Sequence, residues 1–179
     1  MAVSIVDNTK LRSFMYIPGD DGEEGNFYVE GKGASEVTYN FDVSLYETHY
    51  ISDLSKTTIV IGQSFNYSIS TDIVGDETSA GFQVDRFVEN IMGRKVGKEA
   101  ETESLLVFLY RKGKQENSFY ALKYKVSVQP ANVAVSGGVP LKREYSVSGI
   151  GDAVVGSVVV SPTSNGDITA VFTPDEEVV

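Results

Sequence analysis

The chain has no cysteine, no tryptophan and a single histidine among its 179 residues. The lack of cysteine excludes disulfides, thiolate-bound metals and thiol catalysis. Because there is one histidine, any serine–histidine–aspartate triad must be built around His49, yet no serine lies in a Gly-x-Ser-x-Gly nucleophile motif. A solvated loop histidine is the simpler interpretation of His49. The sequence therefore predicts a protein that is not an enzyme.

Long apolar runs are also missing. The longest, Leu105 to Tyr110, is far shorter than the ~20 residues that cross a bilayer. The segment from Met1 to Phe14 contains Asp7, Lys10 and Arg12 and has no apolar stretch typical of an export signal. We expect a soluble protein that is made in a cytoplasm and does not insert into membranes.

Positive charge is scarce, since the formal net charge is −10. Residues 1–53 carry three basic and ten acidic side chains, whereas residues 94–144 have a basic excess. An acidic chain does not attract phosphates at long range, which argues against sequence-specific binding of nucleic acid. The basic stretch is expected to face an acidic patch, for example on another copy of the chain.

Alternation with a period of two dominates the pattern that is present. Apolar side chains recur at odd positions over 37–45 and 59–69, with polar residues between them, which predicts two long, half-buried antiparallel strands. Further strands are predicted over 14–17, 27–30, 104–112, 120–128, 141–147, 154–160 and 168–172. Val84, Phe87, Val88, Ile91 and Met92 share one face of a helix over 80–92, with Ser79 as N-cap. Residues 93–103 are expected to form a loop.

These elements predict one mostly-β domain over residues 1–179, an antiparallel β-sandwich or barrel with one packed α-helix. Residues 18–26 are predicted as a flexible acidic loop and 175–179 as an acidic tail. Asp20, Asp21, Glu23 and Glu24 could hold a calcium ion, but their spacing does not match an EF-hand loop, and a hydrated turn is the alternative. No cofactor or metal is predicted.

The polar faces of the two long strands lack lysine and arginine. The residues on these faces are Thr38, Asn40, Asp42, Ser44, Ser64, Asn66, Ser68 and Ser70. Long strands with open edges and no gatekeeping charge invite aggregation unless the edges find partners. Subunits that pair edge to edge in a closed ring remove this hazard, so the pattern favours an oligomeric barrel with a polar lumen.

The two strands are joined by a segment over 47–56 that is too long for a tight hairpin turn. It carries three large apolar side chains, Tyr50, Ile51 and Leu54. Two interpretations stay open at this point. The segment either folds back on its own domain or forms an arm that docks on a partner.

The order of these elements resembles that of the tail tube protein, or major tail protein, of long-tailed bacteriophages. The resemblance covers roughly residues 10–173 and is carried by the long strand pair, the helix before the middle strands, and the closing segment KVSVQPANVAVSGGVPLKREYSVSGIGDAVVGSVVV from Lys125. That ending follows the pattern strand, Gly-Gly, strand, Gly-Asp, strand, which is similar to endings in this family.

The resemblance implies a structural virion protein located in the tail and made in the host bacterial cytoplasm. Hexameric rings would stack into a tube whose inner β-barrel is formed by the long strands, and double-stranded DNA would pass through it without sequence-specific contacts. Other partners implied are the tape measure, tail terminator and distal tail proteins. The eight polar residues would line the lumen, and Tyr50, Ile51, Leu54, Arg94, Lys95 and Lys98 would make contacts between rings.

Two other classes share this composition. One is another virion β-protein, such as a capsid decoration or baseplate component. The other is a carbohydrate-binding β-sandwich, which the ten tyrosines allow. Such a module needs a cluster of aromatic residues around a pocket and is often exported.

Overall fold

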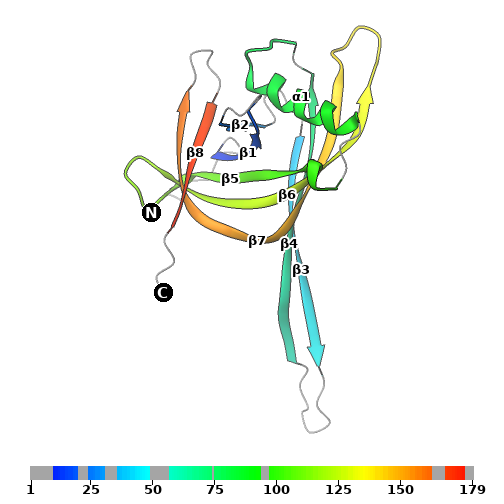
Figure 1. Cartoon of the computed structure of the whole chain (residues 1–179). Helices are drawn as coiled ribbons and strands as arrows, with labels where there is room; N and C mark the ends of the chain where they lie inside the picture. The colour runs from blue at the N-terminus through cyan, green and yellow to red at the C-terminus, as the bar shows by residue number, and fades with distance from the viewer. Residues whose placement is uncertain are drawn as a thin grey trace, which may run out of the picture.

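A computed structural model describes residues 10–19, 24–30, 36–48, 57–73, 75–93, 97–162 and 168–175. Antiparallel strands dominate these residues, which contain one α-helix, so the predicted mostly-β fold is confirmed (Figure 1). The elements are β1 (Leu11–Ile17), β2 (Asn26–Val29), β3 (Glu36–Thr48), β4 (Thr57–Asp72), α1 (Ala80–Met92), a 3₁₀ turn η3 (Gly97–Ala100), β5 (Glu101–Lys112), β6 (Phe119–Ala134), β7 (Lys142–Pro162) and β8 (Ile168–Pro174).

Six of the strands close into a ring. The pairing order is β3-β4-β7-β6-β5-β1-β2-β8, and β7 also pairs with β8. The first part of β7, up to Ser148, pairs with β4, whereas its last part, from Gly156, pairs with β8. The β3–β4 hairpin is thereby attached to the flank of the ring, and Figure 1 shows it running out well past the other elements.

Two apolar cores lie on opposite faces of the shared strands. One takes residues from all six strands of the ring, which places it inside the ring: Phe14, Val29, Leu105, Val107, Ala121, Val158 and Ala170. The other lies beneath α1 and includes Met15, Leu106, Val126, Tyr67 and Tyr145. Because β5 separates the two cores, it is buried on both faces from Ser104 to Val107, as its continuous apolar run predicts.

The helix begins and ends where the sequence predicts. Ser79 is extended, and its hydroxyl accepts a hydrogen bond of 3.1 Å from the backbone of Phe82, as an N-cap does. Two side chains differ from the prediction. Asp85, which is not on the predicted apolar face, is buried, and Met92, which is predicted on that face, is 52% exposed. Asp85 is drawn inward by an arginine of β7, and Met92 lies in the last turn of the helix, beyond the core.

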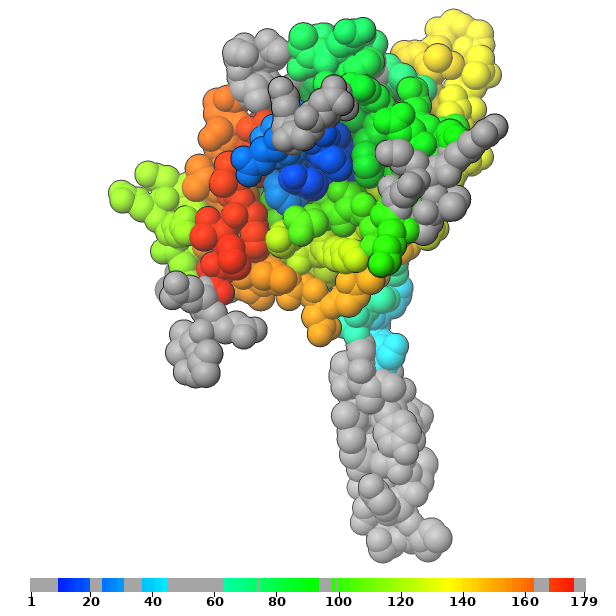
Figure 2. Space-filling view, viewed as in Figure 1, coloured from blue at the N-terminus to red at the C-terminus, as the bar shows by residue number. Residues whose placement is uncertain are grey.

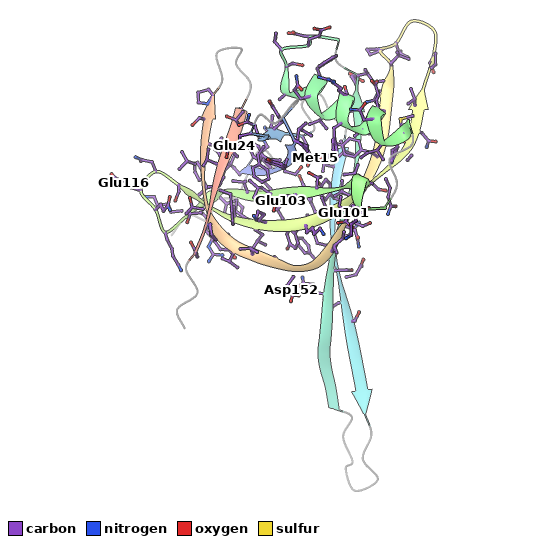
Figure 3. The ribbon with its side chains drawn as sticks, in the orientation of Figure 1. Met15, Glu24, Glu101, Glu103, Glu116 and Asp152 are labelled. Atoms are coloured by element: carbon purple, nitrogen blue, oxygen red, sulfur yellow. The ribbon has the colours of Figure 1, made fainter. Side chains whose placement is uncertain are left out.

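The closing region differs from the prediction of two strands over 141–147 and 154–160. Both belong to β7, which continues through Gly149–Asp152. Lys123 and Lys125 of β6 pair with Val154 and Ile150, so β7 carries two more residues than β6 here. A bulge absorbs extra residues without ending the strand, and Gly151 adopts the required positive φ of 75°. Asp152 lies at this bend, on the outside of β7 (Figure 3).

The predicted loop over 93–103 is also partly wrong. Gly97–Ala100 form η3 and β5 already begins at Glu101, because Ala100 and Thr102 are buried against the core. Three further boundaries differ by a few residues. β3 extends to Thr48, β2 begins at Asn26 inside the predicted acidic loop, and Asp175 is fixed by hydrogen bonds to Val155 and Ser157. No helix among the described residues has the length and apolar character to span a bilayer.

Candidate assembly surface

The polar residues of the two long strands form one continuous face. The register of β3 and β4 places Thr38 opposite Ser68, Asn40 opposite Asn66, and Asp42 opposite Ser64. All of the eight predicted residues are exposed or half-buried, whereas Phe65, Tyr67 and Ile69, which alternate with them on β4, are buried. The hairpin thus has one wet and one dry side, as strand geometry requires.

The polar face extends beyond the hairpin onto β7 and β6. Asn66 of β4 is opposite Ser148 of β7, which in turn is opposite Ser127 of β6. In the next row, Ser68 is opposite Ser146, which is opposite Gln129. Four strands, β3, β4, β7 and β6, therefore present hydroxyl and amide groups side by side. Sequence reasoning missed the contributions of β7 and β6. The alternation of Ser146 and Ser148 with buried Tyr145 and Val147 was visible, but the pairing of β7 with β4 was not.

Charges on this face are few and lie mostly at its borders. Asp42 accepts a hydrogen bond of 3.3 Å from the amide of Asn66. Lys125, on the same side of β6, has its Nζ 2.6 Å from a carboxylate oxygen of Glu101 in β5, which offsets its charge. Lys142 and Glu144 begin β7 at the opposite border. Figure 3 shows Glu101 at the beginning of β5. The two rows of residues that run through Asn66 and Ser68 are uncharged across β3, β4, β7 and β6.

Beneath the polar face, aromatic side chains attach the hairpin to the rest of the molecule. Phe65 stacks on Tyr124 of β6 with ring centroids 4.2 Å apart, and Tyr39 and Tyr67 are tilted against each other at 5.5 Å. Gly149 of β7 lies directly against β4, since a β-carbon on it would be 2.9 Å from the carbonyl oxygen of Phe65. The base of the hairpin is therefore packed tightly.

A buried carboxylate ties this base to the ring. Glu30, which follows β2, is 4% exposed and accepts hydrogen bonds from the hydroxyls of Tyr67 at 2.7 Å and Tyr145 at 2.9 Å. Burial raises the pKa of Glu30 to about 7, although the hydrogen bonds from Tyr67, Tyr145 and Ser13 act in the opposite direction. Burial likewise raises the pKa of Tyr67 and of Tyr145, and the nearby Glu30 charge adds to it.

A second buried charge links β7 to the helix. Arg143 is 2% exposed, and its guanidinium lies 3.3 Å from the carboxylate of Asp85 and 2.5 Å from that of Glu89. Arg143 also donates to the backbone carbonyl of Asp85. No sequence motif marks either Glu30 or Arg143, because each is a single charge in an alternating strand or turn.

Two edges of the four-stranded polar sheet are open among the described residues. β3 pairs only with β4 along its whole length. At the other border, β5 pairs with β6 as far as Ser127, so residues 128–134 of β6 have β7 on one side alone. Unpaired strand edges are ready templates for another strand.

The predicted contacts between rings fall largely outside the described residues. Tyr50, Ile51, Leu54, Arg94 and Lys95 lie there, as do His49 and the acidic residues Asp20, Asp21 and Glu23. Lys98 is described and is exposed in η3. Among the described residues, no three histidine or acidic side chains are grouped closely enough to hold a metal ion.

No protein-family profile and no curated protein matches the sequence. Solved structures do match the fold. A chain of the tail of an empty GTA particle, refined with helical and C6 symmetry, aligns with a TM-score of 0.52 at 8% identity, over 83% of this chain and 97% of that one. A chain of the virion of a native gene transfer agent particle aligns with a TM-score of 0.54 at 9% identity, over 84% and 98%.

A chain of the sheath–tube complex of an extracellular contractile injection system also aligns, at a TM-score of 0.46 and 8% identity, over 84% of this chain and 90% of that one. The two chains that align with a TM-score above 0.5 thus come from the tail and the virion of gene transfer agent particles. The resemblance to tail tube proteins that the sequence predicts is confirmed at the level of the fold.

Proposed function

We propose that this chain is the structural subunit of a phage-type tail tube. The observation that carries the proposal is the four-stranded polar face, which has no basic residue between its borders and is bounded by two open strand edges. In a ring of subunits, the edge of β3 in one copy pairs with residues 128–134 of β6 in the next copy. This pairing gives partners to the open edge of β6 and to part of the edge of β3, and it continues the polar face around a channel.

The ring contains six copies. The C6 symmetry of the GTA tail, in which a chain of the same fold occurs, supports this number. Rings stack into a tube, and Tyr50, Ile51 and Leu54 of the 47–56 loop contact the next ring together with Arg94, Lys95 and Lys98. The protein resides in the tail of a virion and is made in the cytoplasm of a bacterial host.

The role is physical and not enzymatic. Thr38, Asn40, Asp42, Ser44, Ser64, Asn66, Ser68 and Ser70 line the lumen. The hydroxyl and amide groups among them hydrogen-bond to water, and Asp42 is acidic, so none of the eight neutralises phosphates. DNA that passes through the tube therefore releases few counterions and is not retained. The same channel accommodates the tape measure protein before DNA enters, and the ends of the tube contact the tail terminator and distal tail proteins.

Electron microscopy of the purified protein tests this function directly. We expect hollow tubes in negative stain, and native mass spectrometry of the disassembled material should give hexamers. A protein that stays monomeric at all concentrations and forms neither rings nor tubes contradicts the proposal. Closed rings that never stack point to a baseplate-type component instead.

A further inference from the structure

The apolar face of the hairpin sheet runs past the core at both of its ends. On the opposite side from the polar face, Phe65, Tyr67, Ile69, Tyr145 and Val147 are buried beneath α1 and the ring. The same face carries Phe41 and Val43 at one end, and these are 41% and 49% exposed. They lie where β4 no longer pairs with β7, so that no third strand of the described part of the chain flanks the hairpin there.

At the other end, the turn between β6 and β7 carries a second group of exposed apolar side chains. Val133 pairs with Arg143, on the buried side of the sheet, and Leu141 lies on the same side, just before the first residue of β7. The exposed fractions are 41% for Val133, 77% for Val135, 57% for Val139 and 44% for Leu141. Figures 1 and 2 show this turn projecting beside α1, at the end of the molecule opposite to the β3–β4 hairpin.

We name Phe41 and Val43 the hairpin-end surface, and Val133, Val135, Val139 and Leu141 the turn-end surface. We infer that the turn-end surface of one copy packs against the hairpin-end surface of another copy, in the next ring. This inference rests on the proposed function and assigns to the described residues a stacking contact besides the 47–56 loop. Exposed apolar clusters of this kind mark interaction sites.

A second copy is the occupant for two reasons. First, the two surfaces lie at opposite ends of one face, so a head-to-tail contact covers both at once, and such a heterologous contact propagates into a stack. Second, a charge of opposite sign lies beside each surface. The exposed Asp42 lies between Phe41 and Val43, and the exposed Lys142 follows Leu141, with Asp72 as its cross-strand neighbour. The contact is repeated around a ring, so a small surface suffices.

Paired serine substitutions test the contact. We expect V135S/V139S and F41S/V43S each to leave rings intact and to lower the ratio of stacked to free rings at least tenfold, which corresponds to about 1.4 kcal/mol per ring pair. The matched control is V159S/V171S. These two valines are also exposed and are paired across β7 and β8, but they lie on the ring far from either end. Sedimentation velocity and tube lengths in negative stain provide the readout, and circular dichroism checks the fold of each variant.

Charge reversal provides a test that does not depend on apolar surface. D42K alone and K142E alone should each shorten the tubes, and the double variant should restore lengths to within about twofold of the wild type, because the charges are exchanged across the contact. If the double variant shortens the tubes as much as the two single variants do together, the inferred contact between these two ends does not exist.

The outcomes separate this inference from the proposed function. Wild-type tubes that keep their length in both serine variants overturn the inference and leave the tube function standing. If the variants lose both rings and tubes while the subunit remains folded, these residues belong to the contact between subunits of one ring, and the inference is also overturned. A wild-type protein that forms no tubes contradicts both proposals.

Discussion

Tyr67 of β4 donates a hydrogen bond of 2.7 Å to the carboxylate of Glu30, 37 residues earlier in the chain. The hydroxyl of Tyr67 is also 2.8 Å from that of Ser104 on β5. One tyrosine of the polar sheet is thus connected to two elements of the ring. Because Tyr145 of β7 donates to the same carboxylate, Glu30 connects two strands of the polar sheet to the end of β2.

The first prediction concerns pH. The pKa of Glu30 is raised from 4.5 to about 7 in the folded protein, so the folded state holds this proton more tightly than the unfolded chain. The associated stability is present below pH 4.5 and is lost as pH rises through about 7. The loss is on the order of 3 kcal/mol at most. Tyr67, Tyr145 and Ser13 face the carboxyl group, and none of them gains charge in this range.

Urea denaturation at pH 5 and pH 8 measures this loss. The wild type should have a lower free energy of unfolding at pH 8 than at pH 5, and E30Q should show a smaller difference between the two values. Glu24→Gln replaces an exposed residue just before β2, the strand that Glu30 follows. This control should keep the wild-type difference between the free energies of unfolding at the two pH values. An unchanged pH dependence in E30Q contradicts the assignment to Glu30.

The second prediction concerns Arg143. Its replacement by methionine keeps an apolar stem but leaves Asp85 buried without this cation, which should lower the free energy of unfolding by about 3–5 kcal/mol. The double variant R143M/D85N removes the buried charge as well and should recover part of the loss. K112M, which replaces an exposed cation at the end of β5, should change stability by less than about 1 kcal/mol. Thermal and urea melts distinguish these outcomes.

The third prediction concerns the contact between β7 and β4. Alanine at Gly149 places a β-carbon 2.9 Å from the carbonyl oxygen of Phe65 and 3.4 Å from its side chain. The strands must separate slightly, so we expect a loss of about 1–3 kcal/mol in the free energy of unfolding. G137A is the matched control, because a β-carbon there has no neighbour within 4 Å. Equal stability of the two variants is inconsistent with close packing at Gly149.

The fourth prediction concerns the proposed lumen. Lysines at Asn40 and Ser68, N40K/S68K, should leave tubes assembled but slow the passage of DNA, because cations on the polar face bind phosphates. The defect should weaken as salt concentration rises. V159K/V171K adds the same charge to the outer surface of the six-stranded ring within each subunit, and virions that carry it should eject DNA normally. Normal ejection from virions carrying N40K/S68K would rule out a lumen position for these residues.

Sequence alone predicted the elements that depend on local pattern. Each of these signals acts between residues that are close together in the chain. They are the alternation over 37–45 and 59–69, the helical spacing from Val84 to Ile91, and the Ser79 cap. The eight polar residues were found to share one face because side chains alternate along a strand and the two strands pair in phase.

The rest depended on contacts between residues far apart in the chain. Gly149–Asp152 resembles a turn, yet β7 continues because β6 and β4 hold it on either side before the bulge. Asp85 occupies a polar position of the helix, yet it is buried because Arg143 lies 58 residues away in sequence and beside it in space. Glu30 likewise gains its role from Tyr67 and Tyr145, and no local signal reveals that they converge.

The 21 residues of β7 belong to the polar sheet in one half and to the closed ring in the other. A force applied along the hairpin therefore passes from β4 to β7 through their strand pairing, and β7 then carries it into the ring as one continuous strand. The two parts should lose their structure in a single cooperative transition, and a tube built from such subunits should respond to bending as a stiff elastic rod.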